Sequence, residues 1–442
     1  MIVAHPVVVE AARHRASKSF HTRDHGGVST YAMSRPHTAP PSFVSNRLMR
    51  VLLVLNGLGA GGVEQSTAEL LPTLTAHGVD ARVACLYTRA QGVERQVRQQ
   101  GTPVEVLEGA TLRAKTAHLR SIVRDWGPSL VHTALFEADL VGRVAAVGGP
   151  PVLSSIVNDA YSPLRTSDSR VKPWKLALAR LTEATSGRLL TTHFHAISAW
   201  TKSVAVRRLG LPARRITVVP RSRDLDRLGT YSQERRSASR RRLGLTEHQP
   251  VIVTVGRQEH QKGHRHLVTA FERIVTRHDD AVLLCAGREG NETPALQAQV
   301  SRSAVGRPIR FLGHRDDIGD LLVAGDVFAF PSLYEGLGGA MIEACLLGVP
   351  AVASDLPPIR EVVGCRPATV LTPPGRADEL ARGLLLLLDD LPGARSTAQS
   401  AVPRFARNFA SAGVNRRMIQ LYREVAAEHR RPVARRPQRS AS

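Results

Sequence analysis

Two cations that follow a predicted strand in the second half of the chain have the types and spacing of an anion-binding site. Arg257 ends the aliphatic run PVIVTVGR (250–257), and Lys262 comes five residues later, directly before Gly263. Because ligands of open α/β sheets bind beyond the carboxyl ends of the strands, both side chains can converge on one anionic group there. A solvated pair of surface cations is the alternative that this spacing leaves open.

A glycine-rich loop with two glutamates, PSLYEGLGGAMIEACLLGVPAVASD, follows further along the chain (331–355). Glu335 lies in the loop, and a predicted apolar helix that starts near Gly339 contains Glu343. Unpaired backbone N–H groups at a helix start favour phosphate. A carboxylate in the first helical turn is placed to accept hydrogen bonds from sugar hydroxyls. Glutamates eight residues apart are common by chance, so the spacing alone does not define a site.

The first half of the chain contains a G-x-G-x-x-G pattern, formed by Gly57, Gly59 and Gly62 after the strand VLLVL (51–55). A dinucleotide site also needs a carboxylate at the end of the next strand, which here ends in Leu-Tyr-Thr. We therefore do not expect NAD binding. The glycines still allow the backbone to approach a phosphate or a sugar closely, and a tight structural turn is the alternative.

The sequence predicts neither a metal site nor a disulfide framework. Asp224 and Asp226 form a D-x-D pattern, but three-residue matches arise often by chance, and no His, Cys and Asp cluster has zinc spacing. The four cysteines lie far apart without a C-x-x-C pair, and most have apolar neighbours. We expect buried, reduced thiols in a cytosolic protein.

These residues are positioned by strands and helices that alternate along the chain, which predicts an α/β fold with doubly wound parallel sheets. The buried strands are short aliphatic runs, at 51–55, 81–87, 129–135 and 150–157 in the first half and at 250–257, 281–287, 308–314, 326–332 and 349–355 in the second. Two sheets of this kind, one in each half, would place a ligand between them.

The net charge of +22 is concentrated in three segments of the 442-residue chain. A basic waist at 207–242 carries twelve arginines and three acids, and the two ends, 1–48 and 429–442, are also basic. This distribution suits phosphorylated small molecules, an anionic lipid surface or nucleic acid. We expect the waist to be a hinge and the N-terminal stretch to be a disordered extension. No apolar run is long enough to span a membrane.

Four segments together resemble the retaining glycosyltransferases of family 4, which have two Rossmann-like domains facing across a cleft in the GT-B fold. They are VVPRSRDLDRL (218–228), VGRQEHQKG (255–263), FLGHRDDI (311–318) and the stretch 331–363, where Glu335 and Glu343 match the E-x7-E pattern. The resemblance runs from about Met49 to residue 425. It implies an acceptor-side domain at 49–218, a nucleotide-sugar domain at 219–403 and a helix at 404–428 that crosses back.

The resemblance also implies a role for each matched residue. Arg257 and Lys262 would hold the diphosphate of a nucleotide-sugar donor and stabilise the leaving group without a metal. Glu343 would bind the ribose and Glu335 the donor sugar. The other implied donor-binding residues are Gly62, Gly338, Gly339 and Arg315.

One motif departs from the family pattern. Many relatives have His-x-His at the end of the third strand of the first half, where this chain has His132 and Ala134. His132 is carried over as a catalytic residue, with a histidine satisfied inside the core as the alternative. The change at Ala134 bears on the choice of sugar, on the rate, and on whether the chain is an inactive relative.

The sequence thus predicts a cytoplasmic, retaining, metal-independent glycosyltransferase that uses a UDP- or GDP-sugar as co-substrate and no other cofactor. The expected acceptor is lipid-linked or a glycan, and the basic segments predict peripheral attachment to the inner face of an anionic membrane. A GT-B-type nucleotide-sugar epimerase is one alternative. A basic nucleic-acid-binding protein is the other, but only 4% of the residues are aromatic, so no nucleic-acid partner is expected.

Overall fold

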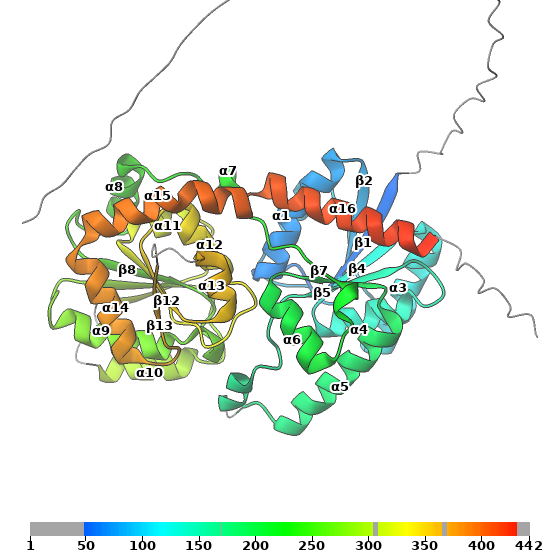
Figure 1. Cartoon of the computed structure of the whole chain (residues 1–442), viewed down its shortest axis with the longest axis horizontal. Coiled ribbons are helices and arrows are strands. Elements are labelled where there is room, and N and C mark those ends of the chain that lie inside the picture. Colours follow the sequence, from blue (N-terminus) through cyan, green and yellow to red (C-terminus); the bar gives the residue numbers. More distant parts are fainter. Residues whose placement is uncertain (1–47, 169, 304–307, 365–368, 431–442) are drawn as a thin grey trace, which may run out of the picture. The chain divides into compact units, whose positions relative to one another are not determined.

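The computed structural model describes residues 48–168, 170–303, 308–364 and 369–430, which form two α/β domains (Figure 1). The predictions for the two basic ends, residues 1–47 and 431–442, and for Cys365 concern residues outside the described part of the chain. The predicted fold class is confirmed: each domain has a parallel sheet with helices on both faces.

The first domain contains a seven-stranded parallel sheet in the order β3-β2-β1-β4-β5-β6-β7. Its central strands are the aliphatic runs expected from the sequence, whereas β6 and β7, which are short and carry histidine or threonine, were not predicted. The bounds are β1 Met49–Leu55, β2 Val79–Cys85, β3 Val104–Val106, β4 Leu130–Ala134, β5 Val152–Ile156, β6 His193–Ala196 and β7 Ile216–Val218.

The second domain contains a six-stranded parallel sheet in the order β10-β9-β8-β11-β12-β13. Alternate residues of β8 face opposite layers: Val251 and Val253 pack with one helical layer, and Ile252 packs with the other. The bounds are β8 Val251–Val255, β9 Val282–Ala286, β10 Ile309–Gly313, β11 Val327–Phe330, β12 Ala351–Ser354 and β13 Thr369–Thr372. The sequence did not predict β13.

Helices cover both faces of both sheets, which explains why the strands are apolar on both sides. The first domain has α1 Gly62–Ala76, α2 Glu94–Gln99, α3 Leu112–Trp126, α4 Phe136–Ala145, α5 Pro173–Leu190 and α6 Ala199–Leu209. Next come α7 Leu225–Leu228, α8 Gln233–Arg242, α9 His264–Val275, α10 Thr293–Arg302, α11 Ile318–Ala324, α12 Gly339–Leu346, α13 Pro357–Val363 and α14 Ala377–Asp389. The described chain ends with α15 Leu391–Phe409 and α16 Ser411–Arg430.

The last helix packs with the first domain, although the chain reaches it from the second. Val414, Met418 and Tyr422 of α16 share one apolar core with β1 and α1. Where the sequence predicted one crossing helix at 404–428, the structure has two helices that meet at Ala410. Two chain segments therefore join the domains, and they pair: the Arg223 N–H donates to the Phe409 carbonyl at 2.8 Å, and the Ser411 N–H donates to the Arg223 carbonyl at 3.0 Å.

The segment 207–242 is not a single hinge, and most of its arginines pair with carboxylates of this protein rather than remaining unpaired. Residues 207–218 belong to α6, β7 and the turn between them, while α8 packs on α11 of the second domain. Seven of the twelve arginines pair with carboxylates inside the protein: Arg208, Arg223, Arg227, Arg235, Arg236, Arg240 and Arg242. More than half of the arginines of the waist are thus neutralised within the protein, although the paired Arg242 side chain is 61% exposed. Five arginines have no carboxylate partner among the described residues: Arg207, Arg214, Arg215, Arg221 and Arg241.

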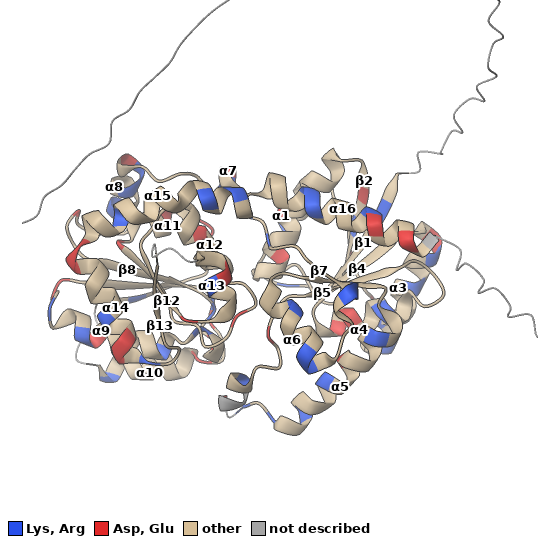
Figure 2. Ribbon diagram, in the orientation of Figure 1, with Lys and Arg blue, Asp and Glu red and all other residues tan. Residues whose placement is uncertain are grey.

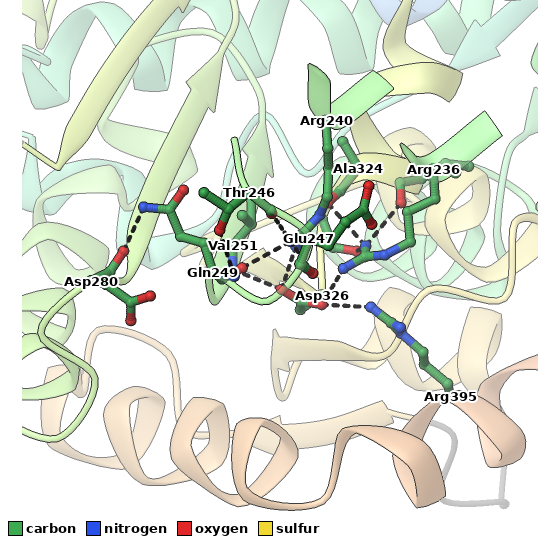
Figure 3. Close-up of polar contacts among 12 residues, drawn as sticks. Arg236, Arg240, Thr246, Glu247, Gln249, Val251, Asp280, Ala324, Asp326 and Arg395 are labelled. Atoms are coloured by element: carbon green, nitrogen blue, oxygen red, sulfur yellow. Dashed lines mark hydrogen bonds and ion pairs between the residues drawn. The ribbon is translucent and has the colours of Figure 1, made fainter. Parts of the chain in front are cut away.

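Asp326, just before β11, is the centre of the tightest of these networks (Figure 3). Its carboxylate pairs with Arg236 at 2.6 Å, Arg240 at 2.7 Å and Arg395 at 2.5 Å, and it accepts the Val251 N–H at 2.8 Å. Backbone carbonyls at the end of α11 take further guanidinium N–H groups, so these buried charges are hydrogen-bonded as well as paired. The network attaches α8 and α15 to the sheet.

The cysteine expectation agrees with the structure for the three described thiols. Cys85, Cys285 and Cys345 are buried and free, and burial raises the pKa of each thiol to about 12. Such thiols stay protonated and are poor nucleophiles, as expected for core cysteines.

We predict that Asp326→Asn lowers the free energy of unfolding by about 3–5 kcal/mol, because it leaves buried guanidinium groups without their carboxylate. Asp320→Asn is the matched control: Asp320 also pairs with two arginines, Arg235 and Arg242, but is partly exposed. The control should lose only about 1 kcal/mol. Urea unfolding checks both variants, and equal losses would contradict the internal role of the Asp326 network.

Candidate active site

The candidate site lies at the point where strand order reverses in the second sheet. Consecutive strands run outward in one direction from β8 and in the other direction from β11, and the two strands are neighbours. The loops that follow them therefore diverge and leave a crevice at their carboxyl ends, which is where open α/β sheets bind ligands. Arg257 and Lys262 follow β8, and Glu335 follows β11.

Lys262 and Glu335 form an ion pair across this point. The Lys262 Nζ lies 2.5 Å from Oε1 of Glu335, and the Ser332 hydroxyl donates to the same oxygen at 2.8 Å. Glu335 is buried, and Lys262 also lies over the ring of Phe330. An ammonium has three N–H donors, so Lys262 retains donors for a ligand while it holds Glu335 in place.

Gly263 allows the β8 loop to lie close to β11. Its φ is +64°, and a Cβ atom there would come within 2.1 Å of the Pro331 carbonyl oxygen. Only glycine fits such a left-handed, crowded position without strain. The Arg257 side chain leaves the same loop and is 44% exposed, and its nearest acid is Glu259 at 3.6 Å. Arg257 is therefore a partly exposed cation with one weak ion pair, on the same loop as Lys262.

The two glycines before α12 and Glu343 lie together, with Arg223 beside them. Glu343 is in the second turn of α12, one turn later than expected, and its Oε1 forms an ion pair with Arg223 at 2.8 Å. A Cβ atom on Gly339 would lie 1.9 Å from the Arg223 guanidinium, so Gly339 leaves room for that side chain. Gly338 has φ +89° and precedes the helix, and no side chain caps the helix start.

Gly62 is the first residue of α1, and Arg221 lies against it. A Cβ atom on Gly62 would come within 2.7 Å of a guanidinium nitrogen of Arg221. Burial and then the neighbouring Arg223 lower the pKa of Arg221 to about 10, against the charges of Glu64 and Glu335. Arg221, in the linker between the domains, thus lies directly against the Gly62 loop.

His132 lies inside a buried hydrogen-bond chain. Its Nδ1 is 2.6 Å from the Tyr422 hydroxyl of α16, and its Nε2 is 2.7 Å from the Ser155 hydroxyl of β5. Ser155 is also 2.7 Å from Nδ1 of His195, whose Nε2 is 2.7 Å from the Val219 carbonyl oxygen.

The Val219 carbonyl fixes the direction of every bond in this chain, because it can only accept. The Nε2 of His195 must donate to it, so Ser155 donates to Nδ1 of His195, His132 donates to Ser155, and Tyr422 donates to His132. Both ring nitrogens of His132 are used within the protein, and burial lowers the pKa of His132 to about 3. The structure thus fits the alternative, a histidine satisfied in the core, and a catalytic role of His132 stays a prediction.

Two other residues lie apart from this centre. Arg315 follows β10 at the edge of the sheet, and both of its bonds go to Asp317, at 2.7 and 2.5 Å. Asp224 caps α7 by accepting the N–H groups of Asp226 and Arg227, so the D-x-D pattern is a helix start. Among the residues that the structure describes, no three His, Cys, Asp or Glu side chains are grouped to hold a metal ion.

Two family models match the chain. The model for glycosyltransferase family 4 matches residues 60–227, and the model for glycosyl transferases group 1 matches residues 249–390. A 2-deoxystreptamine glucosyltransferase from Streptomyces kanamyceticus is 31% identical over 305 residues, which cover 67% of this chain and 77% of that protein. The chain belongs to the group 1, family 4 glycosyltransferases.

Other relatives and solved structures agree with this family. A 2-deoxystreptamine N-acetyl-D-glucosaminyltransferase from Streptomyces fradiae is 26% identical over 390 residues, or 84% of this chain and 89% of that protein. The crystal structure of HepE from Anabaena in complex with UDP-glucose covers 85% of this chain and all of its own, with a TM-score of 0.75 at 22% identity. The predicted GT-B fold is thereby confirmed for this glycosyltransferase.

The sequence missed the two arginines that bracket the site of this glycosyltransferase. Arg223 pairs with Glu343 across 120 residues of chain, and no pattern within either segment signals that contact. Arg221 lies in the segment 218–228 that carries the family resemblance, but its place beside Gly62 depends on how the two linker segments pack. The hydrogen-bond chain through Ser155, His195 and Tyr422 was missed for the same reason.

Two buried neutral histidines make stability depend on pH. Burial lowers the pKa of His132 to about 3 and of His195 to about 4, so in the unfolded chain both take up protons that the folded chain does not bind. Stability is then lost as the pH falls through about 6.5, the unfolded value. Together the pair should cost about 1.5 kcal/mol between about pH 7.5 and about pH 6.

The double variant His132→Gln/His195→Gln should lose about 1.5 kcal/mol less than the wild type over this pH range. Urea unfolding at the two pH values measures the difference. Asp139, whose pKa burial raises to about 6, acts in the opposite direction and is about half protonated at pH 6, but both proteins contain it, so its effect cancels in the difference. Identical losses in the two proteins would contradict the neutral hydrogen-bond chain.

Proposed function

We propose that this glycosyltransferase moves a sugar from a UDP- or GDP-sugar to an acceptor hydroxyl with retention of configuration. The observation that carries the proposal is the Lys262–Glu335 ion pair at the point where strand order reverses. The partly exposed Arg257 and the start of α12, which no side chain caps, belong to the loops that follow the same two strands. HepE, a neighbour in fold, was solved with UDP-glucose, which supports this class of donor.

The leaving diphosphate is stabilised by fixed positive charge in this proposal. Lys262 and Arg257 face the phosphates, and the N–H groups of Gly338 and Gly339 add the positive end of the α12 dipole. Charge that develops on the leaving oxygen is thereby met by groups already in place, which is electrostatic stabilisation of the transition state. These cations do the work at the leaving group that a metal ion does in other transferases.

Glu335 and Glu343 orient the rest of the donor. Glu335, held by Lys262 and Ser332, contacts the sugar hydroxyls, and Glu343, held by Arg223, contacts the ribose. A carboxylate fixed by a cation presents its lone pairs in one direction, and this lowers the entropy cost of binding. The acceptor oxygen attacks from the face of the leaving group, and a donor phosphate oxygen takes its proton.

A lipid-linked or glycan acceptor remains our proposal from the sequence. A small aminocyclitol is the second candidate, since two relatives are named for transfer to 2-deoxystreptamine. Incubation with donor and each acceptor class, followed by mass spectrometry, separates these candidates. Donor alone tests the epimerase alternative, which predicts an altered nucleotide sugar without any acceptor.

We predict that Lys262→Met lowers kcat by about a hundredfold or more, because it removes a charge aimed at the leaving group. Arg257→Met should lower kcat less, since that side chain is more exposed. A thermal-shift screen of UDP, GDP, UDP-glucose and GDP-mannose first identifies the donor, because a ligand that binds the folded state raises Tm. The release of UDP or GDP from that donor then measures the rate.

Arg273→Met is the matched control, since Arg273 is a surface cation of α9 in the same domain, paired with Asp378. It should leave both the rate and the thermal shift unchanged. Full turnover in Lys262→Met would refute the proposed role of this pair. Anomeric configuration in the product, read by NMR, tests retention separately.

A further inference from the structure

The large apolar side chains that are exposed in the described residues gather on one helix. Ten such side chains are exposed there, and four of them, Trp174, Leu178, Leu181 and Leu189, lie on α5. Their exposed fractions run from 57% to 75%. An exposed apolar cluster of this size marks an interaction surface rather than ordinary surface variation.

These four residues form a single stripe along α5. At 100° per residue, spacings of four, three and eight residues place them on one side of the helix. The opposite side packs on α4 and α6, and the buried Gly187 lies against the ring of Phe194. The stripe is thus the outward face of a helix whose inner face is already packed.

The charges beside the stripe are cations. Lys172, Lys175 and Arg188 are exposed on or next to α5, whereas its one acid, Glu183, accepts a hydrogen bond from Tyr161. Figure 2 shows Lys and Arg positions in blue along this helix. Within the described chain, no ion pair engages any of these three cations, although Arg188 donates to the Gly210 carbonyl. An apolar stripe with basic flanks and an exposed tryptophan has the composition of a helix that lies in a membrane interface.

We propose that the outer face of α5 docks on an anionic lipid bilayer. A second copy of the chain is a poorer occupant, because a twofold contact would bring the same cations together. This surface differs from the basic waist, whose arginines are mostly paired within the protein. No helix of the described residues is long and apolar enough to cross the bilayer.

A cavity lies beneath α5, on the side of the helix that faces away from the apolar stripe. It has a volume of about 500 Å³ and is lined by Lys172, Lys175 and Leu176 at α5 and by Val157 at the end of β5. The Val157 carbonyl lies against Gly336, in the loop that carries Glu335. If the proposed transfer reaction holds, this cavity is where the anionic head of a lipid-linked acceptor would bind, because Lys172 and Lys175 both line it. The docking itself does not depend on that reaction.

Co-sedimentation of the full chain with vesicles tests the proposal. The wild type should bind phosphatidylglycerol vesicles and bind phosphatidylcholine vesicles much less. Leu178→Ser/Leu181→Ser should weaken binding at least about tenfold, and Lys172→Gln/Lys175→Gln should weaken it about tenfold. The controls, Leu386→Ser on α14 and Arg241→Gln on α8, change equally exposed residues elsewhere and should bind as the wild type does.

The fluorescence of Trp174 reports whether α5 itself contacts the bilayer, independently of how tightly the protein binds. Trp174 is the exposed tryptophan of three, since Trp126 is buried and Trp200 is half-buried. Vesicles of brominated phosphatidylglycerol should quench the wild-type fluorescence. They should quench Trp174→Phe far less, although that variant sediments with the vesicles to the same extent.

Three outcomes would overturn the proposal. The first is that the wild type does not bind anionic vesicles. The second is that the α5 variants bind as well as the wild type, which would assign binding to another segment. The third is that the wild type is a dimer in solution and that Leu178→Ser/Leu181→Ser converts it to a monomer. The thermal shift with UDP or GDP is measured on the same variants. If UDP and GDP do not raise the Tm of the wild type, the proposed function is refuted, but the result on membrane docking still stands.

Discussion

The approach of the β8 and β11 loops at the strand reversal is the constraint on which the rest of the site depends. The crevice exists because the chain leaves β8 and β11 in opposite directions, and Gly263 is the residue that lets the two loops touch. Once they touch, Lys262 and Glu335 meet at 2.5 Å, and each fixes the other. The charge pattern of the site is thus a consequence of topology and of one position where a Cβ atom does not fit.

Electrostatics in this protein act mainly inside the fold. A net charge of +22 suggests a surface made for polyanions, yet the waist that carries much of it is an internal network around Asp159, Asp320, Asp326 and Glu343. Arginine suits this use, because its planar group hydrogen-bonds carbonyls and carboxylates at the same time. Much of the charge of the basic waist is therefore neutralised within the protein, and Lys172 and Lys175 at α5 are among the described cations that no ion pair engages.

The sequence predicted what depends on local pattern. Aliphatic runs gave the central strands, and the residues around Lys262 and Glu335 were placed correctly because each closely follows a buried strand. Short strands such as β6 and β7 were missed, since three or four residues with polar side chains carry no clear period. The partner of Glu343 and the bonds of His132 could not be predicted, because both depend on contacts between segments more than a hundred residues apart. For His132 the residue type matches the family pattern, and the structure adds what the sequence does not contain: Tyr422 and Ser155 hydrogen-bond both ring nitrogens.

The linker between the domains is part of the site rather than a passive connection. Arg223 pairs through its backbone with Phe409 and Ser411 of the second crossing segment, while its side chain pairs with Glu343 and lies over Gly339. The adjacent Arg221 lies against Gly62, and Val219 ends the hydrogen-bond chain that starts at Tyr422. Any rotation of one domain against the other must therefore change the surroundings of both arginines.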